Sequence, residues 1–188
     1  MTAKALSRYI LALLLLIVPI TAESAPAVEQ TAVSEQTAPT DHYREARPAD
    51  WAFVLRDASS ATHLRMDTIT RETTPRGTVL YGDLKKVYTK HGLLHIYYSL
   101  KNSRESDPGS LALLKQIDHS VSHVSYLADG TSIFCRLHRV TFYNKSGNPI
   151  ETLDFDDIAR QIDTEVEWQE VTRQMTEERA IFYRLANG

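Results

Sequence analysis

The sequence predicts an α+β fold: a meandering antiparallel β-sheet of about five to seven strands with a C-terminal α-helix packed on one face. Two observations lead to this prediction. Several segments alternate apolar and polar residues and are separated by turn residues, which is typical of half-buried strands. The last segment instead places its apolar residues at helical spacing. With 188 residues, 43% of them hydrophobic, the chain is long enough for one domain with a substantial core.

The N-terminus is predicted to lie outside this domain. Lys4 and Arg8 precede an apolar run at 10–20, which is shorter than the roughly 20 residues that a membrane-spanning helix needs. Residues 1–22 therefore fit a secretory signal peptide, cleaved after Ala22 or, as a second choice, after Ala27. We expect an exported protein, periplasmic or on the cell surface, that meets a membrane only through the cleaved signal peptide.

Residues 23–48 contain almost no large apolar side chains, so they are predicted to be a flexible linker before a single domain at 49–188. Removal of 1–22 leaves 19 basic and 24 acidic residues, a net charge of −5. This acidic balance argues against a nucleic-acid partner. The only cysteine, Cys135, cannot form an internal disulfide. We expect a buried, inert thiol there, with an intermolecular disulfide or a reactive thiol as alternatives.

The first half of the domain is predicted to form mostly strands. Trp51, Phe53 and Leu55 alternate with their neighbours, and turn residues follow at 57–60. Gly82-Asp83 suggests the turn of a small hairpin. We expect strands at 51–56, 62–66, 68–70, 78–81, 85–88 and 93–100. In the last of these, His95 and Tyr97 share a mixed face, whereas the opposite face is apolar or aromatic.

The second half is predicted to combine a long hairpin with short helices. Asp129-Gly130 indicates a type I′ turn into a strand at 131–144, and the apolar face of that strand switches near His138-Arg139. A β-bulge there would bring the apolar side chains back to one face. The remaining elements are expected at 110–117 (helix), 121–127 (strand), 149–155 (strand), 158–162 (helical turns) and from Thr176, as a capped C-terminal helix.

Three short motifs suggest a family. They are Met66-Asp67-Thr-Ile69, the hairpin Arg139-Val-Thr-Phe-Tyr-Asn-Lys-Ser-Gly-Asn-Pro-Ile150, and the entry into the last helix at Trp168–Glu177. Together they resemble the surface-adhesin protein E-like family of Gram-negative bacteria over about residues 50–186. The final helix lacks the cysteine that family members commonly pair with a sheet cysteine, and the proline after the Trp segment is missing. The resemblance implies an antiparallel sheet with a helix on one side, in a non-enzymatic exported protein.

Catalytic and metal signatures are not evident in the sequence. His119 and His123 are four residues apart, but no further ligand is spaced to complete a zinc site. The aspartates at 154, 156 and 157 lack the glycine and closing glutamate of a calcium loop. No Gly-x-Ser-x-Gly elbow and no phosphate-binding glycine loop occurs. We therefore predict that the chain is not an enzyme and uses no cofactor or metal.

Most of the nine tyrosines are expected to be half-buried sheet residues. On an open sheet face they would serve as contact groups, because tyrosine brings a large area and a polar tip at low entropic cost. The candidate binding residues are His95, Tyr97, Arg136 and His138. The predicted function is an exported, non-catalytic, adhesin-like protein-interaction domain with an unknown protein partner and the option of a homodimer. The alternative is a periplasmic module that binds a small ligand or metal between sheet and helix. A deep apolar pocket with convergent polar groups would favour this alternative, whereas an exposed pairing edge would favour protein contacts.

Overall fold

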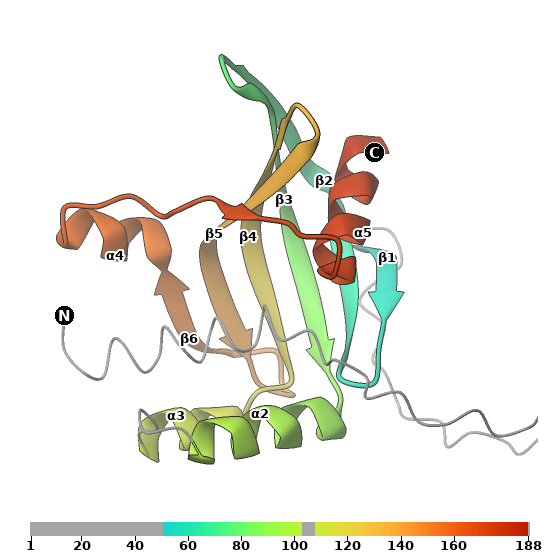
Figure 1. Ribbon diagram of the computed structural model, residues 1–188. Coiled ribbons are helices and arrows are strands. Elements are labelled where there is room, and N and C mark those ends of the chain that lie inside the picture. Colours follow the sequence, from blue (N-terminus) through green and yellow to red (C-terminus); the bar gives the residue numbers. More distant parts are fainter. Residues whose placement is uncertain (1–50, 103–107, 188) are drawn as a thin grey trace, which may run out of the picture.

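The computed structural model describes residues 51–102 and 108–187, so the predicted signal peptide (1–22) and linker (23–48) lie outside the described residues. One antiparallel sheet of seven strands runs in the order β1-β2-β3-β4-β5-β6, with β7 beside β5 (Figure 1). The strands are β1 (Trp51–Arg56), β2 (Ser60–Thr74), β3 (Gly77–Tyr88), β4 (His119–Asp129), β5 (Ser132–Tyr143), β6 (Pro149–Asp154) and β7 (Gln169–Glu170). The helices are α2 (Lys90–Asn102), α3 (Pro108–Leu114), α4 (Phe155–Gln161) and α5 (Thr176–Asn187). The predicted α+β class, with a meandering antiparallel sheet and a C-terminal helix, is confirmed.

One face of the sheet, here called the inner face, carries the core. The strand registers align Leu64, Leu84, Ser122 and Val140 in one row across β2 to β5, and all four are buried. Two hydrophobic clusters lie on this face. One packs α2 and α3 against the lower ends of the strands, and the other packs α5 against the opposite part (Figure 1). The inner face is therefore covered by helices at two separate places.

A β-bulge in β5 keeps the apolar residues of that strand on the inner face. His123 of β4 pairs with Arg139, and the next residue, Val124, pairs with Leu137, so His138 is the extra residue. If His138 took a regular place in the ladder, Leu137 and Val140, which are three residues apart, would point to opposite faces, because side chains alternate along a strand. The bulge predicted near His138-Arg139 is confirmed.

The predicted strand at 93–100 is wrong, because these residues form the middle of α2. Thr89 caps this helix: its hydroxyl accepts the backbone N–H of Gly92 at 3.0 Å, and its carbonyl accepts that of Leu93 at 3.0 Å. The buried residues are Gly92, Ile96 and Leu100, which are spaced by four. Leucines and tyrosines at nearly every position satisfy both a period of two and a period of 3.6, so the alternation alone could not distinguish a strand from a helix.

The predicted hairpin around Gly82-Asp83 is also wrong, because 77–88 is one continuous strand, β3. Gly82 lies on the inner face beneath α5. A Cβ atom at Gly82 would approach Leu185 Cδ2 to 2.8 Å, so the glycine permits close helix–sheet packing instead of a turn. The elements expected at 62–66 and 68–70 are likewise parts of the single strand β2, with a register irregularity between Arg65 and Thr70.

Two local predictions need refinement. The hairpin between β4 and β5 has a positive φ at Gly130 (60°) and none at Thr131, which fits a type II′ turn and not the predicted type I′. The helix α5 begins at Thr176 as expected, but the Met175 carbonyl accepts its first bond, from Arg179 N–H at 3.1 Å. The Thr176 hydroxyl donates to the Gln174 carbonyl and does not cap the helix. None of the described helices has the length and apolar character required to cross a membrane.

Candidate functional site

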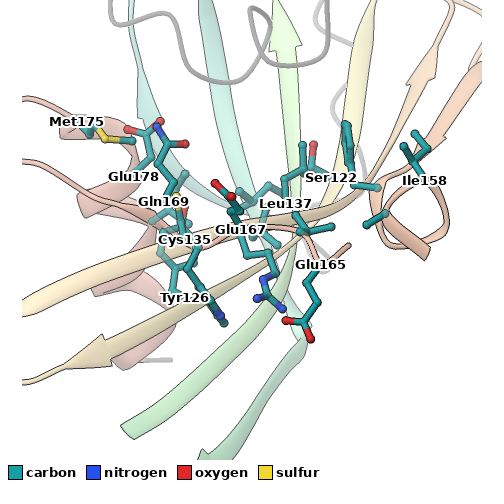
Figure 2. A pocket seen from close by; sticks show the side chains of 18 of the residues that line it. Ser122, Tyr126, Cys135, Leu137, Ile158, Glu165, Glu167, Gln169, Met175 and Glu178 are labelled. Carbon is teal, nitrogen blue, oxygen red and sulfur yellow. The ribbon is translucent and has the colours of Figure 1, made fainter. Parts of the chain in front are cut away.

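A pocket of about 710 Å³ lies between the inner face of the sheet, α4, α5 and the segment 162–169 that connects α4 to β7. Figure 2 shows Met175 and Glu178 on one side of this pocket and Ile158 on the other, with Leu137 and Ser122 between them. The volume falls within the range that small-molecule sites usually have. Its apolar lining consists of Leu84, Val124, Leu137, Phe155, Ile158, Ala159, Ile162, Val166, Met175 and Ile181.

The wall formed by α4 follows from its local sequence. Asp154 caps the helix by accepting the Asp157 backbone N–H at 2.9 Å. Phe155, Ile158, Ala159 and Ile162 then follow at helical spacing, so they form one apolar stripe that lines the pocket. The four charged or polar residues of the helix lie between them along the chain. The predicted helical turns at 158–162 are confirmed, although the helix begins three residues earlier.

A sheltered ion pair lies at the polar end of the pocket, where α5 meets the sheet. Lys86 Nζ lies 2.8 Å from Glu177 Oε2, and the Thr62 hydroxyl donates to Glu177 Oε1 at 2.5 Å. The Lys86 and Glu177 side chains are only 12% and 19% exposed. Both carboxylate oxygens of Glu177 therefore have a donor, and the charge of Lys86 is matched within the protein.

The neighbouring carboxyl group of Glu178 has a less favourable electrostatic environment than that of Glu177. Burial, followed by the nearby charge of Glu177, raises the pKa of Glu178 above its usual value. Within the described part of the chain, no other side chain is hydrogen-bonded to this carboxyl group, which faces its own backbone N–H. The hydroxyl of Tyr126 lies near this carboxyl group. Burial, and then the charges of Cys135 and Glu178, raise the pKa of this hydroxyl well above 10.

Cys135 also lines the pocket and is half-buried, with a free thiol. Burial, and then the charge of Glu178, raises the pKa of this thiol to about 12. A thiol of this kind stays protonated at neutral pH, and the thiolate is the reactive form. The thiol is half-buried and not fully buried as the sequence suggested, and its inertness stays a prediction.

The sheet leaves a gap in its edge beside the pocket. On this side of β5, β7 pairs with Phe134 and Cys135, and β6 pairs only from Arg139 onward. Between these two strands, no described residue pairs with Arg136, Leu137 or His138 on this edge. The Arg136 guanidinium lies over the ring of Trp168, 4.5 Å from its centroid, and both residues line the pocket. This stacked pair closes the pocket near β7.

A hydrogen-bonded chain on the opposite, outer face fixes α4 to the bulge. His138 Nε2 lies 2.8 Å from the Ser125 hydroxyl, and His138 Nδ1 lies 2.9 Å from Asp156 Oδ2, in the first turn of α4. This is the connectivity of a Ser-His-Asp triad. However, Ser125 has no exposed surface, so its hydroxyl cannot meet a substrate in this conformation. These hydrogen bonds therefore hold α4, which forms one wall of the pocket, against the bulge.

The four candidate binding residues come from two separate elements. His95 and Tyr97 lie on α2 because 93–100 is helical, and Arg136 and His138 lie on β5. His95 is exposed, whereas Tyr97 packs on the first cluster with Lys115 Nζ 5.9 Å from its ring. None of the hydrogen bonds, ion pairs or ring contacts of these described residues joins the two pairs. Only Arg136 lines the pocket, and His138 acts on it through Asp156.

The groups considered as metal ligands have other partners. His119 Nδ1 is 3.0 Å from Asp118, and His123 Nδ1 is 2.9 Å from Asp83. Among residues 51–102 and 108–187, no group of three or more His, Cys, Asp or Glu side chains is placed to hold a metal ion. In the acidic turn, Asp154 caps α4, Asp156 contacts His138, and Asp157 pairs with Arg160.

The pocket residues were not recognised as a site from the sequence. Glu177 and Glu178 were not among the candidate residues, and Lys86 is 91 residues away from Glu177 along the chain. No local pattern links residues so far apart. Comparison of the chain with protein-family models, with curated proteins and with solved structures finds no match.

Proposed function

We propose that this chain is an exported, non-catalytic binding module that holds a small, largely apolar molecule between its sheet and helices α4 and α5. The observation that carries the proposal is the pocket of about 710 Å³, in which ten apolar side chains form a continuous lining and charged groups lie at the α5 end and along the segment 162–169. Such a combination of an apolar body and convergent polar groups is typical of small-molecule sites. The export part of the proposal depends on the signal-peptide pattern at 1–22.

Binding without catalysis fits the state of the reactive groups near the pocket. The Cys135 thiol has a pKa raised to about 12 by burial, so little thiolate exists at neutral pH. Ser125, whose hydroxyl contacts His138, is fully buried on the outer face. Neither group is activated and accessible in the way that a nucleophile requires.

A second candidate, protein contact of the adhesin-like kind, is favoured by the edge of the sheet at β1. Among the described strands, β1 has a neighbour on one side only, β2. Phe53 of β1 is 57% exposed, which is unusual for so large an apolar side chain. An open edge strand can pair with a strand of a second chain, including another copy of this one.

Native mass spectrometry of the exported, processed protein distinguishes the two candidates. We expect a native mass that exceeds the denatured mass by a small organic molecule, and loss of this excess in Ala159→Phe, which fills the pocket from α4. A bare chain that also takes up no added 1-decanol would contradict the binding module. A dimer without any bound molecule would favour the contact through β1.

A further inference from the structure

We infer that the pocket selects an amphipathic cation, with an alkyl or aryl body against α4 and a protonated amine near Glu178. This inference rests on the proposed small-molecule binding and names the chemical class of the ligand. It depends on how charge is distributed around the pocket. Two of the charged side chains in the lining neutralise each other, and the others leave an acidic excess.

The polar end of the pocket has one carboxyl group more than it has cations. Lys86 is matched by Glu177 at 2.8 Å, and Thr62 supplies the second donor to Glu177. Glu178 is the adjacent residue and also lines the pocket, yet no described side chain donates to it. Its own backbone N–H and the charge of Lys86 offset the burial of this carboxylate only in part, so its surroundings remain unfavourable for the charge. A ligand ammonium group at this position would supply the missing charge and three hydrogen-bond donors.

The rim of the pocket has the same sign. Glu165 and Glu167 belong to the lining segment between α4 and β7, and Arg136 is the cation on that side. The Arg136 guanidinium already stacks on Trp168, 4.5 Å from the ring centroid. The six charged lining residues, Lys86, Arg136, Glu165, Glu167, Glu177 and Glu178, carry a formal net charge of −2. An anionic ligand would meet this excess on entry and at the polar end, whereas a cation is attracted at both.

The polar and apolar parts of the pocket are also separated in space. Glu178 projects from α5 on one side, and Ile158 of α4 lies on the other (Figure 2). The apolar stripe of α4 continues with Ala159 and Ile162, so a hydrocarbon body has a continuous surface there. A ligand that spans the pocket would therefore place its two chemically different ends in different surroundings. This arrangement fits an amphipathic molecule better than a uniformly apolar one.

Three probes with the same alkyl chain and different head groups test the inference: n-decylammonium, decanoate and 1-decanol. Each is titrated by calorimetry into the processed protein below its aggregation concentration, at neutral pH and low salt. We expect decylammonium to bind roughly tenfold more tightly than decanoate, since one charge-assisted contact in a partly solvated site is worth about that factor. Decanol should lie between the two.

The variant Glu178→Gln removes the charge and keeps the shape. It should reduce the preference for decylammonium over decanoate roughly tenfold and change the affinity for decanol little. Glu170→Gln, an exposed carboxyl on β7 outside the pocket lining, is the matched control and should leave the preference unchanged. Decanoate binding as tightly as decylammonium, or a preference that Glu178→Gln does not alter, would overturn the inference while the proposed binding function stands. If none of the three probes binds, the proposed function itself is wrong.

Discussion

Glu178 shows how one buried carboxyl group links the pocket to the stability of the domain. Burial raises the pKa of Glu178, so the folded chain binds this proton more tightly than the unfolded chain does. In the unfolded chain, the pKa of glutamate is about 4.3. Stability is therefore lost as the pH rises from that value through the raised pKa of the folded state, because ionisation is then less favourable in the folded chain.

Replacement of Glu178 by glutamine should consequently stabilise the unliganded domain at pH 7. We expect the free energy of unfolding to rise by less than about 1 kcal/mol, because solvent screens a half-buried carboxylate. The gain should shrink as the pH falls toward about 4, where the unfolded carboxyl also becomes protonated. Denaturant titrations at several pH values, with Glu170→Gln beside them, measure this. A Glu178→Gln variant that is less stable than the parent at pH 7 would contradict the account.

Disruption of the ion pair between Lys86 and Glu177 should destabilise the domain, in contrast to Glu178→Gln. Lys86→Met leaves the Glu177 carboxylate sheltered without its cation, and we expect a loss of about 1–3 kcal/mol in unfolding free energy. The double variant Lys86→Met/Glu177→Met should recover part of this loss, since removal of both charges leaves none unpaired. Thermal and urea unfolding of the four combinations gives the coupling energy. Additive effects of the two changes would show that the contact is not energetically coupled.

The bulge in β5 makes a prediction about a whole strand. Deletion of His138 would remove the extra residue and leave Leu137, Arg139 and Val140 in regular alternation, so Val140 and Phe142 should stay on the inner face. Both side chains are fully buried there. We therefore expect the deletion variant to fold, with a loss of unfolding free energy close to that of His138→Ala.

His138→Ala is the matched control for the deletion, because it retains the extra backbone residue. It removes the contacts to Ser125 and Asp156 and should cost about 1–3 kcal/mol, chiefly at α4. Circular dichroism and urea unfolding of the two variants separate these effects. A deletion variant that fails to fold beside a folded His138→Ala would contradict the account, because the extra backbone residue itself would then be required.

The elements that the sequence predicted correctly have one dominant local signal. The hairpin at Asp129-Gly130, the bulge near His138 and the start of α5 each depend on residues that are close along the chain. The segment 93–100 was misassigned because its dense apolar residues satisfy two periods, and the cap at Thr89 is a weaker signal than the alternation. Gly82 was misassigned because the residue that requires a glycine there, Leu185, is distant along the chain and packs on it only in the folded protein.

For the molecule as a whole, most consecutive strands from β1 to β6 are joined by short turns, the connection from β3 to β4 through α2 and α3 excepted, so the meandering sheet and the fold class were predictable. The pocket was not, because its walls come from widely separated segments that meet only after the sheet has formed. Thr62, Lys86 and Glu177 illustrate this: their contacts span 91 and 115 residues along the chain. The feature that distinguishes ligand binding from protein contact, a deep pocket or an exposed edge, could still be named from the sequence.

Ligand binding should stabilise the entire domain, since the pocket joins the sheet to both α4 and α5. A ligand at 100 times its dissociation constant raises the unfolding free energy by about 2.7 kcal/mol when only the folded state binds. We expect the melting temperature of the processed protein to rise with the concentration of added n-decylammonium. Ala159→Phe, with its pocket filled, should show no such rise. An equal rise in both proteins would mean that the probe binds elsewhere.

The pocket itself is tested most directly by NMR of isoleucine methyl groups during a titration with 1-decanol, which carries no charge. Ile158, Ile162 and Ile181 line the pocket, whereas Ile96 and Ile117 lie in the core beneath α2 and α3. The account predicts saturable shifts of the three pocket methyl groups at concentrations where the other two do not move. Shifts that appear first at Ile96 or Ile117, or no saturable shift at Ile158, Ile162 and Ile181, would contradict it.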